Sequence, residues 1–256
     1  MTLLSIPLVG YTLKAALRDR LIMIMIVAFV LSICMSLFMA SAVVTEQDMF
    51  SAVFMAGSLR IFAVMGVILF ACFHTRRLFE NREVEYLLSR PISRPEFVLS
   101  IALSFSITAL CFTALAALAI AFSTQHPSAL SFVIWSGSLA VELLIVVNAA
   151  LFFSMVISSA AGSAMATIGF YVFARMMGQL IGISDGGSSL PGGELLKYIF
   201  DFISMFMPRL DLLTQTGWLI YGVDNMSESL LSLAHGAVFI PVILLAAIFD
   251  LLRREF

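Results

Sequence analysis

The chain has 256 residues, of which 61% are hydrophobic and only 12% charged, and its formal net charge is −2. Soluble domains carry about 25% charged residues, so the composition excludes an ordinary soluble domain and predicts an all-α integral membrane protein. The few basic residues are sorted along the chain by loop and form no patch, so we expect no nucleic-acid partner. One transmembrane domain, residues 1–256, accounts for the whole sequence.

Residues 1–20 are expected to form a helix at the inner membrane surface. Pro7 suits a helix start, because its missing N–H lies where a helix has no internal acceptor. Apolar and basic residues alternate along this segment: Leu8, Tyr11, Ala15 and Leu17 with Lys14, Arg18 and Arg20.

Six apolar segments follow that are long enough to cross a bilayer, which needs about 20 residues of helix. We expect spans at Leu21–Val44, Phe50–Phe73, Phe97–Phe122, Phe132–Ile157, Ala160–Ile183 and Leu230–Leu252. A cleaved signal peptide is the alternative for the first one, because Ala40, Ser41 and Ala42 have the small-residue form of a cleavage site. Its apolar run of about 19 residues exceeds the 7–15 typical of a signal peptide, which favours a retained span.

The positive-inside rule predicts the orientation, because cytoplasmic loops carry an excess of Lys and Arg. With both termini in the cytoplasm, only Lys197 and Arg209 among the loop cations fall outside. The cations that fall inside are Lys14, Arg18, Arg20, Arg76, Arg77, Arg82, Arg90, Arg94, Arg253 and Arg254.

The loop between the second and third spans, residues 74–96, is the only long charged stretch and carries five of the chain's fourteen Lys and Arg residues. Pro91 and Pro95 disfavour helix in the residues before them. The pattern therefore predicts a short cytoplasmic helix over Arg76–Ser89, then a rigid elbow, then the third span. The alternative is a loop that only holds positive charge inside, but Glu80, Glu83 and Glu85 are not needed for that purpose.

This loop resembles a pattern found between spans two and three in permeases of ABC transporters of the type-2 exporter class. The matching residues are Glu80, Glu85, Leu87, Leu88, Ser89, Pro91, Ile92, Ser93, Arg94 and Glu96. The resemblance implies a coupling helix that docks in a groove of a separate ATP-binding subunit. We assign that contact to Glu80, Glu83, Glu85, Leu87, Leu88, Pro91, Ser93 and Arg94, of which Glu83 departs from the family pattern. The resemblance also implies a second permease chain, membrane lipid around both, and residence in the bacterial inner membrane.

A second match lies in the external segment 184–229, where Pro208–Leu213 with Tyr221 and Gly222 resembles a stretch before the last span of these permeases. The segment is too hydrophobic for a free loop and too polar for a span. We expect short amphipathic or re-entrant helices, broken at Pro208, that cap the outer face. Asp211 belongs to this cap, and Trp218 and Tyr221 are expected at the headgroup level, where aromatic rings settle.

No catalytic, nucleotide-binding or dinucleotide motif occurs in the chain. His74, His126 and His235 are scattered, and the three cysteines fall inside predicted spans without metal-ligand spacing. We therefore expect a non-catalytic subunit without a cofactor or metal, with ATP and Mg bound by a partner chain.

Arg60, Glu142 and Arg175 fall within predicted spans, where an isolated charge facing lipid costs about 2.5–3.5 kcal/mol. Counted at 1.5 Å per residue, all three lie at roughly 12–15 Å from the outer face. Glu142 is therefore expected to pair with Arg60 or Arg175, as a structural ion pair or as a substrate or gating site. Asn148 is expected to form hydrogen bonds between helices.

The leading hypothesis is the membrane subunit of an ATP-driven exporter. One alternative is an ATP-independent secondary transporter or channel that uses Arg60, Glu142 and Arg175. The other is a membrane assembly subunit that recruits a soluble partner and transports nothing.

Overall fold

The computed structural model describes residues 4–42, 47–81, 83–84, 93–123, 128–186, 198–200, 202–204, 207–223 and 225–253, and the regular structure in them is helical. Six helices are long and apolar enough to span a membrane, as expected for a multi-pass membrane protein. They are α2 (Arg20–Ala42), α3 (Gln47–Glu80), α5 (Arg94–Ser123), α6 (Ala129–Val156), α7 (Ala160–Gly186) and α9 (Met226–Arg253). Each of the six predicted spans corresponds to one of these helices, with ends that differ by a few residues except at the end of α3.

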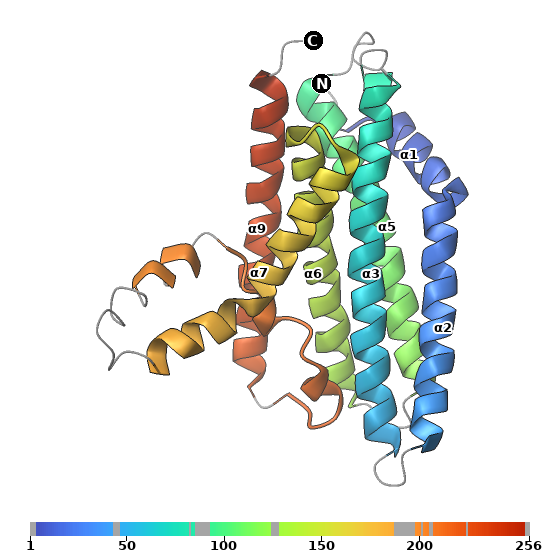
Figure 1. The fold of residues 1–256 in the computed structure, drawn as a ribbon, viewed down its shortest axis with the longest axis vertical. Helices are drawn as coiled ribbons and strands as arrows, with labels where there is room; N and C mark the ends of the chain where they lie inside the picture. Colours follow the sequence, from blue (N-terminus) through green and yellow to red (C-terminus); the bar gives the residue numbers. More distant parts are fainter. Residues whose placement is uncertain are drawn as a thin grey trace.

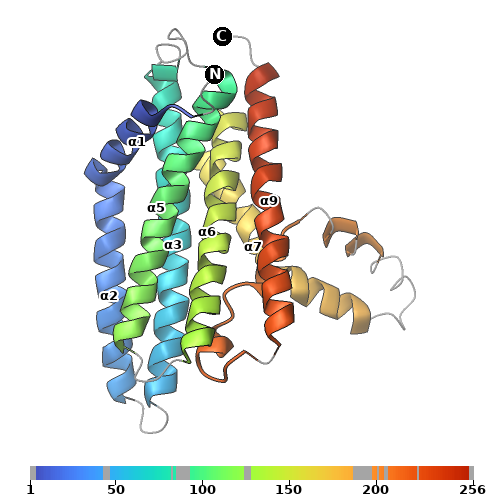
Figure 2. The ribbon, with the colours of Figure 1, turned by 180° about the vertical axis from the view of Figure 1, so that it is seen from behind.

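The six helices form one bundle in which α6 is central (Figure 1). Helix α6 packs against α3, α5, α7 and α9, whereas α2 and α9 lie at opposite edges. The view from behind shows the same order, and in both views the last turns of α7 lean away from the bundle (Figure 2).

Small residues allow α2 and α3 to approach closely, which is how helices pack in lipid. The Met25 side chain lies where a Cβ at Gly66 would stand, so any other residue there would require Met25 to move. The Ser36 hydroxyl donates to the Ser51 carbonyl at 3.0 Å, which adds a polar contact to the same interface.

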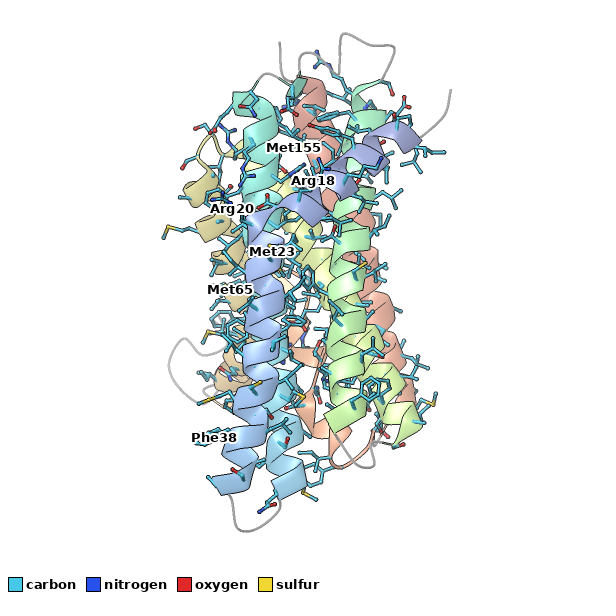
Figure 3. The ribbon with its side chains drawn as sticks, turned by 90° about the vertical axis from the view of Figure 1, so that its right-hand side faces the viewer. Arg18, Arg20, Met23, Phe38, Met65 and Met155 are labelled. Carbon is cyan, nitrogen blue, oxygen red and sulfur yellow. The ribbon has the colours of Figure 1, made fainter. Side chains whose placement is uncertain are left out.

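A separate helix, α1 (Ile6–Arg18), precedes the bundle with a proline in its first turn, as predicted. Leu8, Thr12 and Ala16 form its buried stripe, and the helix packs against α5. Asp19 alone, in an extended conformation, separates α1 from α2. Figure 3 shows the resulting bend, with Arg18 on one side and Arg20 on the other.

The prediction of a separate helix beginning at Arg76 is wrong at its start, because Arg76–Glu80 is the last part of α3. No glycine or proline lies between Phe73 and Glu80 to stop the helix, and Leu78 is buried against the core. The chain leaves the helix at Asn81 and is helical again at residues 83–84. The rest of the predicted coupling helix, including Glu85, Leu87, Leu88 and Pro91, lies outside the described residues.

Candidate functional site

The segment before α9 folds back into the bundle instead of lying on top of it. This re-entrant segment, residues 207–223, contains two short 3-10 helices, η1 (Leu210–Leu212) and η2 (Thr216–Leu219). Helix η1 contacts α7 and α9, and η2 contacts α3 and α6. Leu210, Leu213 and Thr214 are fully buried. This part of the expected cap therefore folds between the helices of the bundle, and the predicted break at Pro208 lies at its start.

A buried polar cluster holds the re-entrant segment. We call it the Glu142 cluster, and it consists of Arg60, Ser138, Glu142, Tyr171, Arg175 and Thr214. Ser138 lies nine residues into α6, which at 1.5 Å per residue places the cluster about 13 Å from that end of the helix.

Glu142 is fully buried, and both of its carboxylate oxygens are occupied. The Tyr171 hydroxyl donates to Oε1 at 2.9 Å, and the Thr214 hydroxyl donates to Oε2. Arg175 Nη1 lies 3.6 Å from Oε1, within salt-bridge distance. The expected pairing of Glu142 with an arginine at matched depth is confirmed, and the partner is Arg175.

Both intramembrane arginines donate to backbone carbonyls of the re-entrant segment. Arg175 Nη1 bonds the carbonyls of Leu210 and Leu213 at 2.6 and 2.8 Å, and Arg60 Nη1 bonds the carbonyl of Thr214 at 3.0 Å. The Leu210 carbonyl also accepts from the Leu213 N–H at 3.1 Å, but carbonyls that follow the last turn of a short helix, such as those of Leu213 and Thr214, have no partner within it and need one when buried. The two cations therefore hold the segment at this depth.

Thr214 is the point where the polar contacts converge. Its φ of 50° lies in the left-handed region, which costs a residue with a side chain roughly 1–2 kcal/mol. Its backbone N–H donates to Ser138 Oγ at 3.0 Å, its hydroxyl donates to Glu142, and its carbonyl accepts from Arg60. These three contacts offset the strain and fix one conformation of the turn.

A second ion pair lies within the same segment, at the place where the segment packs against α7. Arg209 Nη2 and Asp211 Oδ2 are 3.0 Å apart. The Asp211 carboxylate lies where a Cβ at Gly178 would stand, so the absence of a side chain there permits this approach.

Asn148 does not link two helices as expected. Its amide donates to the Leu144 carbonyl on the same helix at 2.7 Å, and its Oδ1 is buried without a partner among the described residues. A short polar side chain inside a helix often bonds the carbonyl four residues earlier, and this local bond replaces the expected one.

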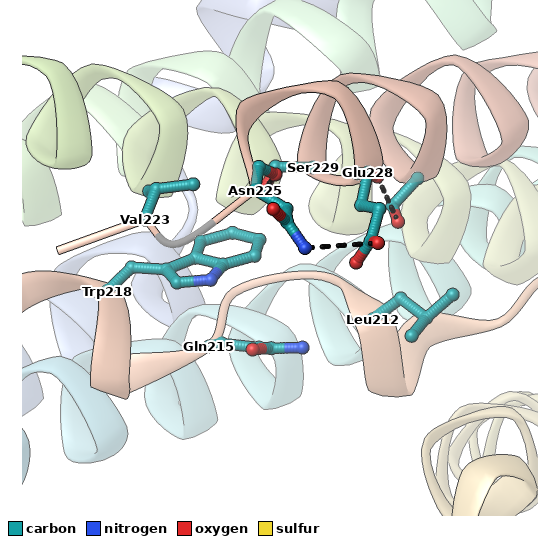
Figure 4. Close-up of a pocket in the computed structure, with 8 residues that line it drawn as sticks. Leu212, Gln215, Trp218, Val223, Asn225, Glu228 and Ser229 are labelled. Atoms are coloured by element: carbon teal, nitrogen blue, oxygen red, sulfur yellow. Dashed lines mark hydrogen bonds between the residues drawn. The ribbon is translucent and has the colours of Figure 1, made fainter. Parts of the chain in front are cut away.

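Trp218 and Tyr221 lie in different environments. Trp218 is partly buried and lines a cavity of about 220 Å³ with Gln215, Asn225 and Glu228 (Figure 4). Tyr221 is 80% exposed. Their placement at the headgroup level stays a prediction.

A second group of polar contacts lies at the opposite end, where α1, the start of α2 and the end of α3 meet; we call it the α1–α3 junction. Asp19 Oδ1 accepts from the Leu21 N–H at 3.0 Å, and Asp19 Oδ2 accepts from Arg77 Nη1 at 3.0 Å. The Tyr11 hydroxyl donates to Glu83 Oε2 at 3.3 Å. The Glu83 carboxylate disfavours a phenolate beside it and raises the pKa of Tyr11 above its usual range.

Of the other residues assigned to coupling, Glu80 is exposed at the end of α3. Ser93 and Glu96 form a capping box at the start of α5, because each side chain bonds the backbone N–H of the other, at 3.4 and 3.5 Å. Arg94 Nη1 donates to the Leu251 carbonyl at the end of α9 at 3.0 Å. The start of α5 is therefore joined to the end of α9.

Several members of these groups carry no strong signal in the sequence. Ser93-x-x-Glu96 is a recognisable capping box, and Asp19 is a common helix-capping residue. No sequence pattern distinguishes Tyr171 and Thr214 from the other tyrosines and threonines of the chain. Only the fold brings them to Glu142.

The chemistry available in the described part of the chain is that of ion pairs and hydrogen bonds, with no group of three metal-ligating side chains close enough to hold a metal. The chain matches no model of a known protein family and no curated protein.

Proposed function

We propose that this chain is the membrane-spanning permease subunit of an ATP-driven ABC transporter of the exporter type. In this proposal it forms the substrate path, and a separate ATP-binding subunit supplies the energy. A second permease chain, the same or homologous, completes the path within the membrane lipid.

The observation that carries the proposal is the set of contacts on both sides of residues 85–92. Before them, Glu83 bonds Tyr11 of α1, and Arg77 bonds Asp19 at the start of α2. After them, Arg94 bonds the end of α9. A partner that pressed on this loop would therefore move α1, α2 and α9 together with α3 and α5.

The re-entrant segment suits the role of an outer closure in this scheme. Its anchors come from three helices: Arg60 on α3, Glu142 on α6 and Arg175 on α7. A tilt of α3 relative to α6 and α7 would separate these anchors and release Thr214. The segment would then open the path from the far end.

The orientation belongs to the same proposal. Helix α1, the end of α3, the start of α5 and the end of α9 lie at one end of the bundle (Figure 1), and most of the basic loop residues belong to them. By the positive-inside rule this end faces the cytoplasm of a bacterial cell, with both termini inside.

An ATP-independent carrier that uses Arg60, Glu142 and Arg175 is less well supported. Such a site must release its partners to a substrate or ion, whereas both Glu142 oxygens and both arginines bond the re-entrant segment or each other. This geometry favours the structural role of the ion pair.

The test is purification of the tagged chain from its native membrane in mild detergent, followed by measurement of MgATP hydrolysis in the eluate. We expect an ATP-binding chain to be retained at a fixed ratio. A photo-crosslinker at Glu83 should label that chain. The same crosslinker at Gln215, at the other end of the bundle, should not.

The coupling role is tested with Arg94→Ala in the reconstituted complex. In this variant, which lacks the bond to α9, we expect the ATP-binding chain to stay attached and to hydrolyse ATP without driving transport. Arg20→Ala, which removes another exposed cation, is the control. An eluate without ATP hydrolysis, or crosslinks at Gln215 instead of Glu83, would refute the proposal.

A further inference from the structure

A pocket of about 210 Å³ lies at the α1–α3 junction. It is lined by Tyr11, Ala15, Arg18, Asp19, His74, Arg77, Leu78, Asn81 and Glu83. Pockets for drug-sized molecules measure about 300–1,000 Å³, so this one suits a smaller polar group.

The carboxylates that line the pocket are already occupied. Asp19 accepts from Leu21 and Arg77, and Glu83 accepts from Tyr11 and from Asn81 Nδ2 at 3.4 Å. A cationic ligand would have to displace these donors. The pocket therefore does not favour a cation.

The basic side chains retain donors. The Arg77 side chain remains 55% exposed while one of its nitrogens bonds Asp19. Arg18 is exposed at the bend between α1 and α2 (Figure 3), and no acidic side chain in the described part of the chain lies within 4 Å of its guanidinium. Two guanidinium groups that border one pocket favour an anion that can accept several hydrogen bonds at once.

His74 supplies a buried donor in the same pocket. Its side chain is 7% exposed and packs against the rings of Phe70 and Phe105, at centroid distances of 5.4 and 5.7 Å. Its Nε2 is buried without a hydrogen-bond partner among the described residues. A buried polar atom normally has a partner. This atom is closed off from solvent, so a ligand in the pocket would satisfy it once the pocket wall over it moves.

From these observations we propose that the pocket binds a phosphate group through Arg18, Arg77 and His74. The group belongs to a phospholipid headgroup or to a soluble phosphate. Leu17 and Ile6 on α1 are exposed apolar residues, which suits a helix that lies among headgroups. The proposal concerns a binding site and does not depend on an ATP-binding partner.

The test uses the purified full-length chain in a neutral detergent, to which phosphatidylglycerol is added, and native mass spectrometry to count the lipid retained on each chain. We expect one tightly retained phospholipid. Arg18→Gln and His74→Phe should each weaken retention about tenfold, because each removes a charge-assisted or buried hydrogen bond. Arg20→Gln removes an exposed charge just outside the pocket and should leave retention unchanged.

Two further ligands identify the source of the phosphate. Diacylglycerol lacks the phosphate and should not be retained. If millimolar inorganic phosphate displaces the lipid and raises the unfolding temperature of the wild type but not of Arg18→Gln, the site recognises soluble phosphate as well. Equal retention by Arg18→Gln, His74→Phe and Arg20→Gln, or equal retention of diacylglycerol, would overturn the proposal.

Discussion

The Glu142 cluster and the α1–α3 junction both connect helices of this bundle through polar side chains, and they differ in how their charged members are paired. In the Glu142 cluster the carboxylate and both arginines bond one another or the re-entrant segment. At the α1–α3 junction the carboxylates are paired, but Arg18, Arg77 and His74 line an open pocket.

The difference follows from the cost of unpaired polar groups in each place. Deep inside a membrane bundle an unsatisfied charge or backbone group costs several kcal/mol. Each charged side chain of the Glu142 cluster therefore has a partner, although Arg60 Nε is buried without one among the described residues, and the cluster acts as an anchor. Near the end of the bundle water and lipid headgroups satisfy the remaining donors, so the α1–α3 junction remains able to bind a ligand.

The largest effect is expected for Glu142→Gln, which leaves Arg175 without a counter-charge. Removing one partner of a buried ion pair costs roughly 3–5 kcal/mol, and we expect the lower end because the Arg175 side chain is 23% exposed. The measurement is the free energy of unfolding in detergent, with urea or heat.

A second substitution distinguishes the true partner. Glu142→Gln combined with Arg175→Gln should recover part of the lost stability, because the stranded charge is removed. The combination with Arg60→Gln should recover none. Equal recovery by both double variants would mean that the cluster responds to its total charge and not to the pair in the structure.

The Glu142 cluster shows how far the sequence could predict a site. Counting residues from the ends of the spans was sufficient to pair Glu142 with an arginine, because helical rise is regular. It could not choose between Arg60 and Arg175, since that depends on how the helices are rotated. It also could not predict that the backbone of a distant turn, at Thr214, accepts from Arg60.

The next largest effect is expected at Thr214, where a hydroxyl and a strained backbone contribute in opposite directions. Thr214→Val removes the donor to Glu142 and keeps a branched side chain in the left-handed region, so we expect a loss of about 1–3 kcal/mol. Thr214→Gly also removes the donor but relieves roughly 1–2 kcal/mol of strain, so it should be the more stable of the two. The reverse order in thermal unfolding would show that the backbone is not strained.

The α1–α3 junction was less predictable than the spans. The length of the apolar runs alone predicted all six spans, because a helix needs about 20 apolar residues to cross a bilayer. The contact between Asp19 and Arg77 joins residues 58 positions apart, and no local pattern encodes it. The expected helix start at Arg76 failed because charged residues can continue a helix whose buried face, at Leu78, still packs.

A smaller effect is expected from two glycines of α7 that form a matched pair. Gly178→Ala would place a methyl group against the Asp211 carboxylate and push the re-entrant segment away, which should lower stability by about 1–3 kcal/mol, as overpacking does. Gly182 has nothing near its Cβ position, so Gly182→Ala should be neutral or stabilising by up to about 1 kcal/mol through helix propensity. Equal thermal shifts for the two variants would argue against close packing of Asp211 on α7.

The smallest effect concerns Tyr11, which is half exposed at the open α1–α3 junction. The Glu83 carboxylate raises the pKa of its phenol above the ordinary value of 10.0, so the folded protein holds this proton more tightly than the unfolded chain does. The resulting stabilisation is fully present below pH 10 and is lost as the pH rises through the higher pKa of the folded state. The unfolding temperature of the wild type should therefore fall more steeply above pH 10 than that of Tyr11→Phe, and the two should differ little in pH dependence near neutrality.

An ultraviolet difference titration of wild type against Tyr11→Phe isolates this phenol from the other four tyrosines. A midpoint at or below 10 would show that Tyr11 and Glu83 are not in contact in solution.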